Sequence, residues 1–137
     1  MTQFGVFLLF DGSCRQAMEF YRACFGGDLT LTRVGESAAK NFMPAAMHER
    51  IVYAQLKGGR VQISASDWLM PNRQPTRGNT VCLYLSGGSK QELNGLFDNL
   101  SQGAEVTDPM RDEVHGLYGA LNDKFGVRWM FQTNTKE

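Results

Sequence analysis

The feature that most constrains the fold of this chain is a pattern that repeats at a distance of 76 residues. When residues 5–29 are shifted by 76 positions without a gap, apolar positions fall on apolar positions and Gly12–Ser13 falls on Gly88–Ser89. Each copy begins with a short apolar run and continues through a glycine turn. It then places apolar residues at the spacing of an amphipathic helix. The chain is therefore predicted to contain two copies of one supersecondary unit.

The start and the end of each predicted helix carry specific signals. Ser13 is followed three residues later by Gln16, and Ser89 by Glu92, which is the spacing of a capping box. Glycines that can adopt the left-handed conformation of a helix end follow both segments: Gly26, Gly27 and Gly103. Both helices are expected to begin directly after their serine cap.

Strand-like segments surround each helix, so that each half has the order β-α-β-β-β. The predicted strands are residues 5–10, 28–34, 49–57 and 60–66 in the first half, and 80–86, 104–108, 115–121 and 127–133 in the second. Gly58–Gly59 predicts a two-residue hairpin turn. Residues 35–47 form a long loop and a candidate mobile lid.

These elements predict a single α+β domain over residues 1–137, built from two modules. The first module covers residues 1–66, a linker with Pro71, Pro75 and Gly78 covers 67–79, and the second module covers 80–137. One helix covers only one face of a four-stranded sheet. Two such units can therefore close their open faces against each other around a cavity, as a cupped mixed sheet or half-barrel with the helices outside. A ferredoxin-like pair and a mixed α+β sandwich without a cavity are the alternatives.

Charge and cysteine content exclude several classes of protein. Fourteen basic residues balance fourteen acidic ones, and no basic run occurs, which disfavours binding to nucleic acid or to an anionic membrane. The apolar run at residues 4–10 is too short to span a bilayer, and no basic residue precedes it as in a signal peptide. Three cysteines without a Cys-x-x-Cys pair are typical of reduced thiols, so we expect a cytoplasmic protein.

Three segments together resemble a known superfamily: Ala17–Tyr21 in the first helix, Asp123–Met130 near the C-terminus, and Ala65–Asp67 after the fourth strand. With the paired modules, they are similar to the vicinal oxygen chelate superfamily, which includes glyoxalase I, bleomycin-resistance proteins and extradiol dioxygenases. The closest resemblance is to its PhnB-like branch, often labelled a demethylubiquinone methyltransferase-like domain. The resemblance covers essentially the whole chain and implies a homodimer.

The resemblance does not extend to the chemistry of a methyltransferase or a metalloenzyme. The glycines occupy turns and helix ends, not a cofactor-binding loop. The superfamily's four metal-ligand positions fall near Phe4 or Gly5, near Ile63 or Ser64, at Thr80 and at Met130, and none offers a good ligand for a divalent metal. We therefore expect no cofactor. A shift of 67 residues superposes His48 on His115, which leaves this pair as the one residual metal hypothesis.

Alternation along the strands predicts which residues face the expected cavity. The outer, helix-covered set is Val61, Ile63, Ala65, Val81, Leu83, Leu85, Val127, Trp129 and Phe131. The inner, ligand-binding set is Gln62, Ser64, Thr80, Tyr84, Arg128 and Met130, and Phe4, Val6 and Leu8 are expected to add apolar wall. Arg128 is the leading ligand contact, because a buried guanidinium needs an anionic partner and no carboxylate is predicted on the same inner set.

The predicted function is binding of a small organic molecule without the superfamily's metal. One alternative is a metal-dependent lyase, isomerase or dioxygenase. The other is a structural or interaction protein whose inner polar residues bond to one another in a filled barrel. No catalytic residue is assigned: Cys14, Cys24 and Cys82 are the only thiols, and no serine has a histidine assigned beside it.

Overall fold

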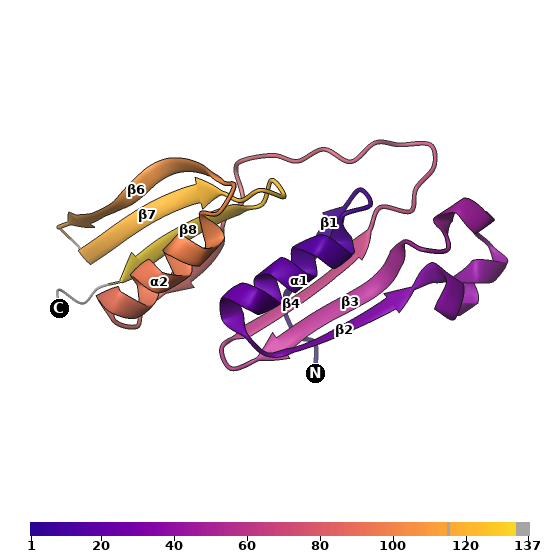
Figure 1. Ribbon diagram of the computed structural model, residues 1–137, viewed down its shortest axis with the longest axis horizontal. Coiled ribbons are helices and arrows are strands. Elements are labelled where there is room, and N and C mark those ends of the chain that lie inside the picture. Colours follow the sequence, from indigo (N-terminus) through magenta and orange to yellow (C-terminus); the bar gives the residue numbers. More distant parts are fainter. Residues whose placement is uncertain (115, 134–137) are drawn as a thin grey trace. The chain divides into compact units, whose positions relative to one another are not determined.

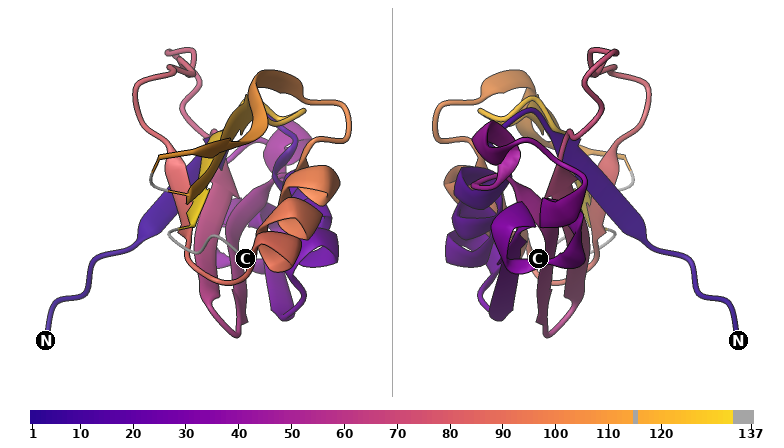
Figure 2. Two further views of the ribbon diagram at one scale, coloured as in Figure 1. Left: turned by 90° about the vertical axis from the view of Figure 1, so that its left-hand side faces the viewer. Right: turned by 90° about the vertical axis from the view of Figure 1, so that its right-hand side faces the viewer.

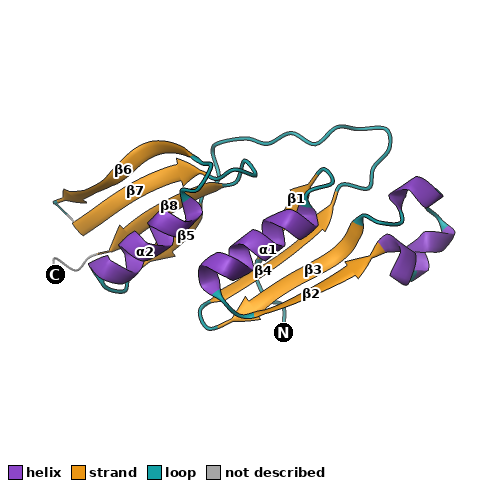
Figure 3. Cartoon of the chain, viewed as in Figure 1, coloured by secondary structure: helices purple, strands orange, loops and turns teal. Residues whose placement is uncertain are grey.

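The computed structural model describes residues 1–114 and 116–133. The chain divides into two compact units, Met1–Thr76 and Arg77–Glu137, each with one sheet and one long helix (Figures 1 and 3). None of the helices in the described ranges is long and apolar enough to cross a membrane.

The first unit holds four strands, one α-helix and three short 3₁₀ helices. In chain order they are β1 (Val6–Phe10), α1 (Cys14–Phe25), β2 (Asp28–Arg33), η1 (Val34–Glu36), η2 (Ala38–Asn41), η3 (Ala45–Met47), β3 (Ile51–Gly58) and β4 (Val61–Asp67). The strand order is β1-β4-β3-β2, with β1 parallel to β4 and the other neighbours antiparallel. The predicted candidate lid is thus three short helical turns, and the hairpin turn after β3 lies at Gly59–Arg60, one residue later than predicted.

The second unit repeats this arrangement. Its elements are β5 (Leu83–Ser86), α2 (Lys90–Leu100), β6 (Glu105–Glu113), β7 (Gly116–Asn122) and β8 (Arg128–Thr133). The strand order β5-β8-β7-β6, with β5 parallel to β8, matches that of the first unit. The predicted α+β class with two βαβββ modules is confirmed.

In each unit the helix covers one face of the sheet, and the apolar core lies between them (Figure 1). In the first unit Phe10, Met18 and Leu56 are buried there. In the second unit the rings of Phe97 on α2 and Phe131 on β8 meet edge to face, with centroids 5.1 Å apart. The opposite face of each sheet, which no helix of its own unit covers, carries the more exposed side chains and is called the uncovered face below.

The predicted alternation is confirmed along β4 and β8. Ile63 and Ala65 are buried while Gln62 is exposed, and Trp129 and Phe131 are buried while Arg128 and Met130 are only half-buried.

The start of β5 was predicted wrongly. Because β8 begins at Arg128 and Leu83 pairs with Trp129, β8 has no residue for Thr80 to pair with. Thr80 therefore lies outside the sheet, and Val81, which was predicted to be covered, is 79% exposed.

The predicted orientation of β1 was also wrong. Leu8 pairs with Ala65 on the helix-covered face and is 8% exposed, and Val6, two residues before it, pairs with Ile63 on the same face. Phe7 and Leu9, at 51% and 40% exposed, lie on the uncovered face instead. The alignment of the two repeats without a gap places Phe7 and Leu9 on Leu83 and Leu85. These two leucines share the helix-covered face with Trp129 and Phe131. A slip of one residue between the repeats reverses every side chain of a strand.

The two helix caps differ. The Ser89 hydroxyl accepts from the backbone N–H of Glu92 at 3.0 Å, which confirms the predicted cap of α2. At α1 the carboxylate of Asp67, at the end of β4, replaces the predicted Ser13 hydroxyl. Its Oδ1 accepts from the N–H groups of Gly12 and Cys14, both at 3.0 Å, and its Oδ2 from that of Ile51 at 2.8 Å.

This difference predicts unequal effects of two matched substitutions. Ser89→Ala should lower the free energy of unfolding by about 1 kcal/mol, because it removes the acceptor for the first turn of α2. Ser13→Ala should change it by less than about 0.5 kcal/mol, because Asp67 already accepts from the start of α1. Urea unfolding of both variants measures the difference. A larger loss for Ser13→Ala would contradict the cap assignment.

Candidate functional site

The uncovered face of the first unit carries small side chains along its middle, from Ser64 and Ser66 on the central strand β4. Larger side chains stand on the two neighbouring strands: Phe7 and Leu9 on β1, paired with Ser64 and Ser66, and Tyr53 and Gln55 on β3. This arrangement was missed in the sequence because β1 was assigned to the wrong face.

Two aromatic rings, from the strands on either side of β4, lie close together on this face. The ring centroids of Phe7 and Tyr53 lie 6.3 Å apart at an interplanar angle of 41°. Both side chains are exposed to solvent, at 51% and 42%, while Ser66 beneath them is only 7% exposed. Exposed aromatic side chains that gather on one surface are typical of an interaction site.

A pocket of about 480 Å³ lies at the start of β1 and β4. The six residues that line it are all uncharged: Gln3, Phe4, Gly5, Val6, Gln62 and Ser64. The structure thus brings together Gln62 and Ser64, two of the predicted ligand-binding residues. The N-terminal segment before β1 extends away from the sheet of its own unit, and Phe4 is fully exposed (Figure 2).

The uncovered face of the second unit brings together three other predicted residues. Tyr84 pairs with Met130 across β5 and β8, and Arg128 lies two residues before Met130 on the same face. Tyr84 is 56% exposed, and its hydroxyl donates to Oε1 of Gln132 at 3.3 Å. Thr80, the remaining member of the predicted set, is exposed and precedes the strand.

Arg128 lies at one end of a polar row that crosses three strands. Its Nη1 donates to Oγ1 of Thr107 at 3.1 Å and to Oδ1 of Asn122 at 3.2 Å, and the Nδ2 of Asn122 donates to Oε1 of Glu105 at 2.7 Å. The guanidinium also lies 3.9 Å from Oδ2 of Asp108.

The expectation that no carboxylate shares the face with Arg128 was therefore wrong. The strand was predicted to end at Asp108, whereas β6 continues to Glu113. Register shifts on either side of Asp108 bring its side chain toward Arg128. Pro109 accounts for part of this irregularity, because proline has no backbone donor for the ladder.

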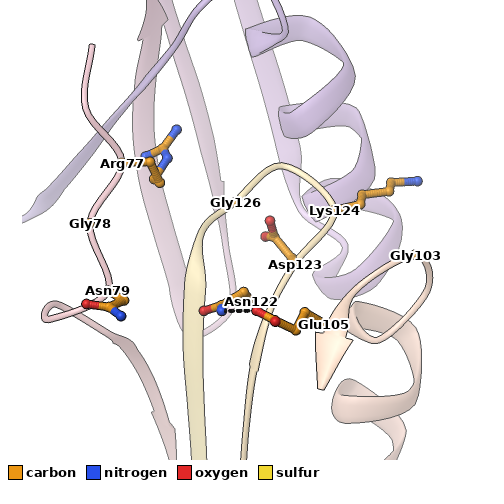
Figure 4. Close-up of a pocket in the computed structure, with 9 residues that line it drawn as sticks. All are labelled: Arg77, Gly78, Asn79, Gly103, Glu105, Asn122, Asp123, Lys124 and Gly126. Carbon is orange, nitrogen blue, oxygen red and sulfur yellow. Dashed lines mark hydrogen bonds between the residues drawn. The ribbon is translucent and has the colours of Figure 1, made fainter. Parts of the chain in front are cut away.

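A second pocket, of about 630 Å³, lies at the end of the β7–β8 hairpin in the second unit (Figure 4). It is lined by Arg77, Gly78, Asn79, Gly103, Glu105, Asn122, Asp123, Lys124 and Gly126. The lining has two basic and two acidic residues, so its formal charges cancel. Asp123 is committed to the fold, since its oxygens accept from the N–H groups of Phe125 and Val127 and from Nε1 of Trp129. This pocket was not predicted from the sequence, because strand alternation gives no information about residues in turns.

The residues do not fit the metal that the resemblance implies. The positions at which the resemblance places the four metal ligands carry phenylalanine or glycine, isoleucine or serine, threonine, and methionine, which are poor ligands for a divalent cation. Within residues 1–114 and 116–133, no three His, Cys, Asp or Glu side chains gather as a metal site requires. His48 ends η3, and its Nε2 lies 3.1 Å from the carbonyl oxygen of Met43. His115, its predicted partner, lies outside the described residues.

Among the three cysteines, Cys14 is held in an unreactive state. It is fully buried at the start of α1. Burial, and secondarily the nearby negative charge of Asp67, raise the pKa of the Cys14 thiol to about 12. A raised pKa keeps the thiol protonated at neutral pH, and the thiol is a far weaker nucleophile than the thiolate.

This pKa predicts selective alkylation. Iodoacetamide at pH 8 should modify the half-buried Cys24 and Cys82 in the folded protein but leave Cys14 unmodified, and urea should make all three reactive. Peptide mass spectrometry with and without urea makes the comparison. Rapid labelling of Cys14 in the folded protein would contradict the assigned burial.

Comparison with known proteins agrees with this architecture. The family model described as 3-demethylubiquinone-9 3-methyltransferase matches residues 2–132. Protein YjdN of Escherichia coli (strain K12) is 26% identical over 136 residues, covering 90% of each chain. The crystal structure of protein PA1353 from Pseudomonas aeruginosa is 30% identical, with a TM-score of 0.85 over 97% of this chain and 98% of that one.

More distant structures share the fold. The PhnB protein from Bacillus cereus is 21% identical, with a TM-score of 0.73 over 96% of this chain and 99% of that one. A glyoxalase/bleomycin resistance protein/dioxygenase family enzyme from Burkholderia phytofirmans PsJN is 14% identical, with a TM-score of 0.61 over 95% and 96% of the two chains. These structures show a shared fold, and the family model, which matches residues 2–132, shows that the chain belongs to the 3-demethylubiquinone-9 3-methyltransferase family.

Proposed function

We propose that this protein binds a small organic molecule on the uncovered faces of its sheets, without a metal centre. The observation that carries the proposal is the composition of these faces. Exposed aromatic rings, Phe7 and Tyr53 in one unit and Tyr84 in the other, stand beside a few polar side chains. Ligand sites typically combine such apolar contact area with a few polar groups that fix orientation.

Methyl transfer is not part of the proposal, although the family's description names it. A nucleotide-like cofactor of the doubly wound fold is held at a glycine-rich turn between a strand and a helix, where the backbone approaches it closely. Here the N–H groups of Gly12 and Cys14, in the turn between β1 and α1, both donate to the carboxylate of Asp67. These two N–H groups are therefore already hydrogen-bonded within the protein.

The absence of a metal centre is supported by the residue types at the family's ligand positions. Elemental analysis of the purified protein tests it, with less than about 0.1 equivalent of zinc, nickel, manganese or iron expected per chain. One equivalent of metal that is lost in His48→Ala/His115→Ala would favour a metal-dependent lyase, isomerase or dioxygenase instead.

Ligand binding itself is tested by saturation-transfer NMR with a panel of planar aromatic acids, amides and alcohols. We expect members of the panel to bind, and binding to weaken when exposed aromatic residues of the uncovered faces are replaced by alanine. If no member binds at millimolar concentration, the filled-barrel alternative gains support. We also propose a homodimer, which sedimentation velocity at micromolar concentration tests directly.

A further inference from the structure

We propose that the uncovered face of the first unit selects an uncharged planar molecule. Its ring system stacks on Phe7 and Tyr53, and its polar end enters the pocket beside Gln62 and Ser64. This selectivity takes the ligand binding proposed above as given and adds the chemical class of the ligand and the unit that binds it.

The two rings suit a planar guest. Phe7 and Tyr53 stand on either side of β4, and their centroids, 6.3 Å apart, lie within the range of interacting aromatic pairs. Because the two rings already contact each other, a flat ring system would stack on their solvent-exposed surfaces rather than between them. Both rings expose close to half of their surface, and a stacked guest would remove this apolar area from water.

The adjoining pocket favours a neutral ligand. Gln3 and Gln62 offer amide donors and acceptors, and Ser64 offers a hydroxyl. These groups hydrogen-bond a neutral amide, carbonyl or hydroxyl, and none of the six lining residues offers a charged group an ion pair to replace its lost hydration. Outside the lining, Lys57 is in register with Gln62 and Asp28 is in register with Lys57, so one positive and one negative charge flank the pocket on this face.

The second unit provides the contrast. Its uncovered face carries Arg128 beside Asp108, and Arg111 stacks on the ring of Tyr118, 5.5 Å from its centroid, while pairing with Glu113. A neutral planar molecule there would have to cover charged groups that are already solvated or paired. The face of the first unit, whose pocket lining is uncharged, is therefore the better match for a neutral guest.

Two probes of equal shape and different charge test this selectivity: 2-naphthamide, which is neutral, and 2-naphthoate, which is an anion at pH 7. We expect 2-naphthamide to bind the wild-type protein at least tenfold more tightly in an NMR titration. Phe7→Ala and Tyr53→Ala should each weaken its binding about three- to tenfold, the range measured for one aromatic contact.

A matched control removes an exposed aromatic residue elsewhere. Phe42→Ala, in the η2–η3 segment and 83% exposed, should leave the affinity for 2-naphthamide unchanged. Gln62→Lys, at an exposed position, should reverse the preference toward 2-naphthoate, while Gln62→Met should weaken both probes without reversing it.

Several outcomes would overturn the proposal. Equal or tighter binding of 2-naphthoate to the wild type would remove the selectivity for neutral ligands. Loss of 2-naphthamide binding in Tyr84→Ala but not in Tyr53→Ala would move the site to the second unit and leave the proposed function intact. If Phe7→Ala and Tyr53→Ala change the sedimentation coefficient and not the affinity, the face is an interface between copies of the chain. If neither naphthyl probe binds, the selectivity fails, while the wider panel separately decides whether the protein binds ligands at all.

Discussion

Replacing Asp67 by alanine should lower the free energy of unfolding by about 3–5 kcal/mol, because three backbone N–H groups lose their acceptor and each unsatisfied buried donor costs about 1–3 kcal/mol. Asp67 is 3% exposed. It joins three parts of the first unit: the end of β4, the turn before α1 and the start of β3. Water cannot readily replace the carboxylate at a buried position.

Urea unfolding followed by circular dichroism measures this effect. Asp11→Ala is the matched control, since Asp11 pairs with Arg50 at the surface, where such a pair contributes at most about 1 kcal/mol. The loss of free energy of unfolding in Asp67→Asn should lie between the losses in Asp67→Ala and Asp11→Ala. The asparagine amide keeps one acceptor oxygen, but its NH₂ group faces backbone N–H donors. A loss below 1 kcal/mol for Asp67→Ala would show that the carboxylate does not organise these segments.

Replacing Trp129 by alanine should also cost about 3–5 kcal/mol, as for other buried large aromatic side chains. Trp129 is 2% exposed beneath α2, and its Nε1 donates to Oδ2 of Asp123 at 2.8 Å. Trp129→Phe keeps most of the packing but leaves this oxygen without its donor, so it should cost about 1–3 kcal/mol.

Arg128 directly precedes Trp129 in β8 and lies on the opposite face of the sheet, so Arg128→Met is the control. It should change the free energy of unfolding by less than about 1 kcal/mol, because the Arg128 charge sits in a partly desolvated site whose nearest carboxylate, Asp108, is itself partly exposed. Thermal melting of the three variants makes the comparison. If Arg128→Met unfolds the protein and Trp129→Ala is tolerated, the faces of β8 are inverted.

Strand alternation in the sequence predicted the faces of β4 and β8 correctly. Each of these strands alternates apolar residues with polar or amphipathic ones, and alternation is a local property that needs no knowledge of the partner strand. For the same reason Gln62 and Ser64 were found on one face, and Arg128 and Met130 on another.

The features that the sequence analysis missed depend on long-range or irregular structure. Phe7 was assigned to the wrong face because the alternation of side chains in β1 is offset by one residue from that in β5. An alignment of the two copies without a gap cannot show this offset. The Asp67 carboxylate reaches the N–H of Cys14 across 53 residues of sequence, and Ser13 offered a nearer and plausible cap. Asp108 meets Arg128 through register shifts beside Pro109 that alternation does not anticipate.

The central claim, that the uncovered sheet faces bind a small organic molecule, is tested most directly by mapping where a probe binds. Backbone and side-chain amide resonances of the isotope-labelled protein are followed while 2-naphthamide is added. Saturable shifts should be largest in β1 and β4 and at the side-chain amide of Gln62, while resonances of α1 and α2 stay in place. Saturable shifts centred on the helices, with none on either uncovered face, would contradict the claim.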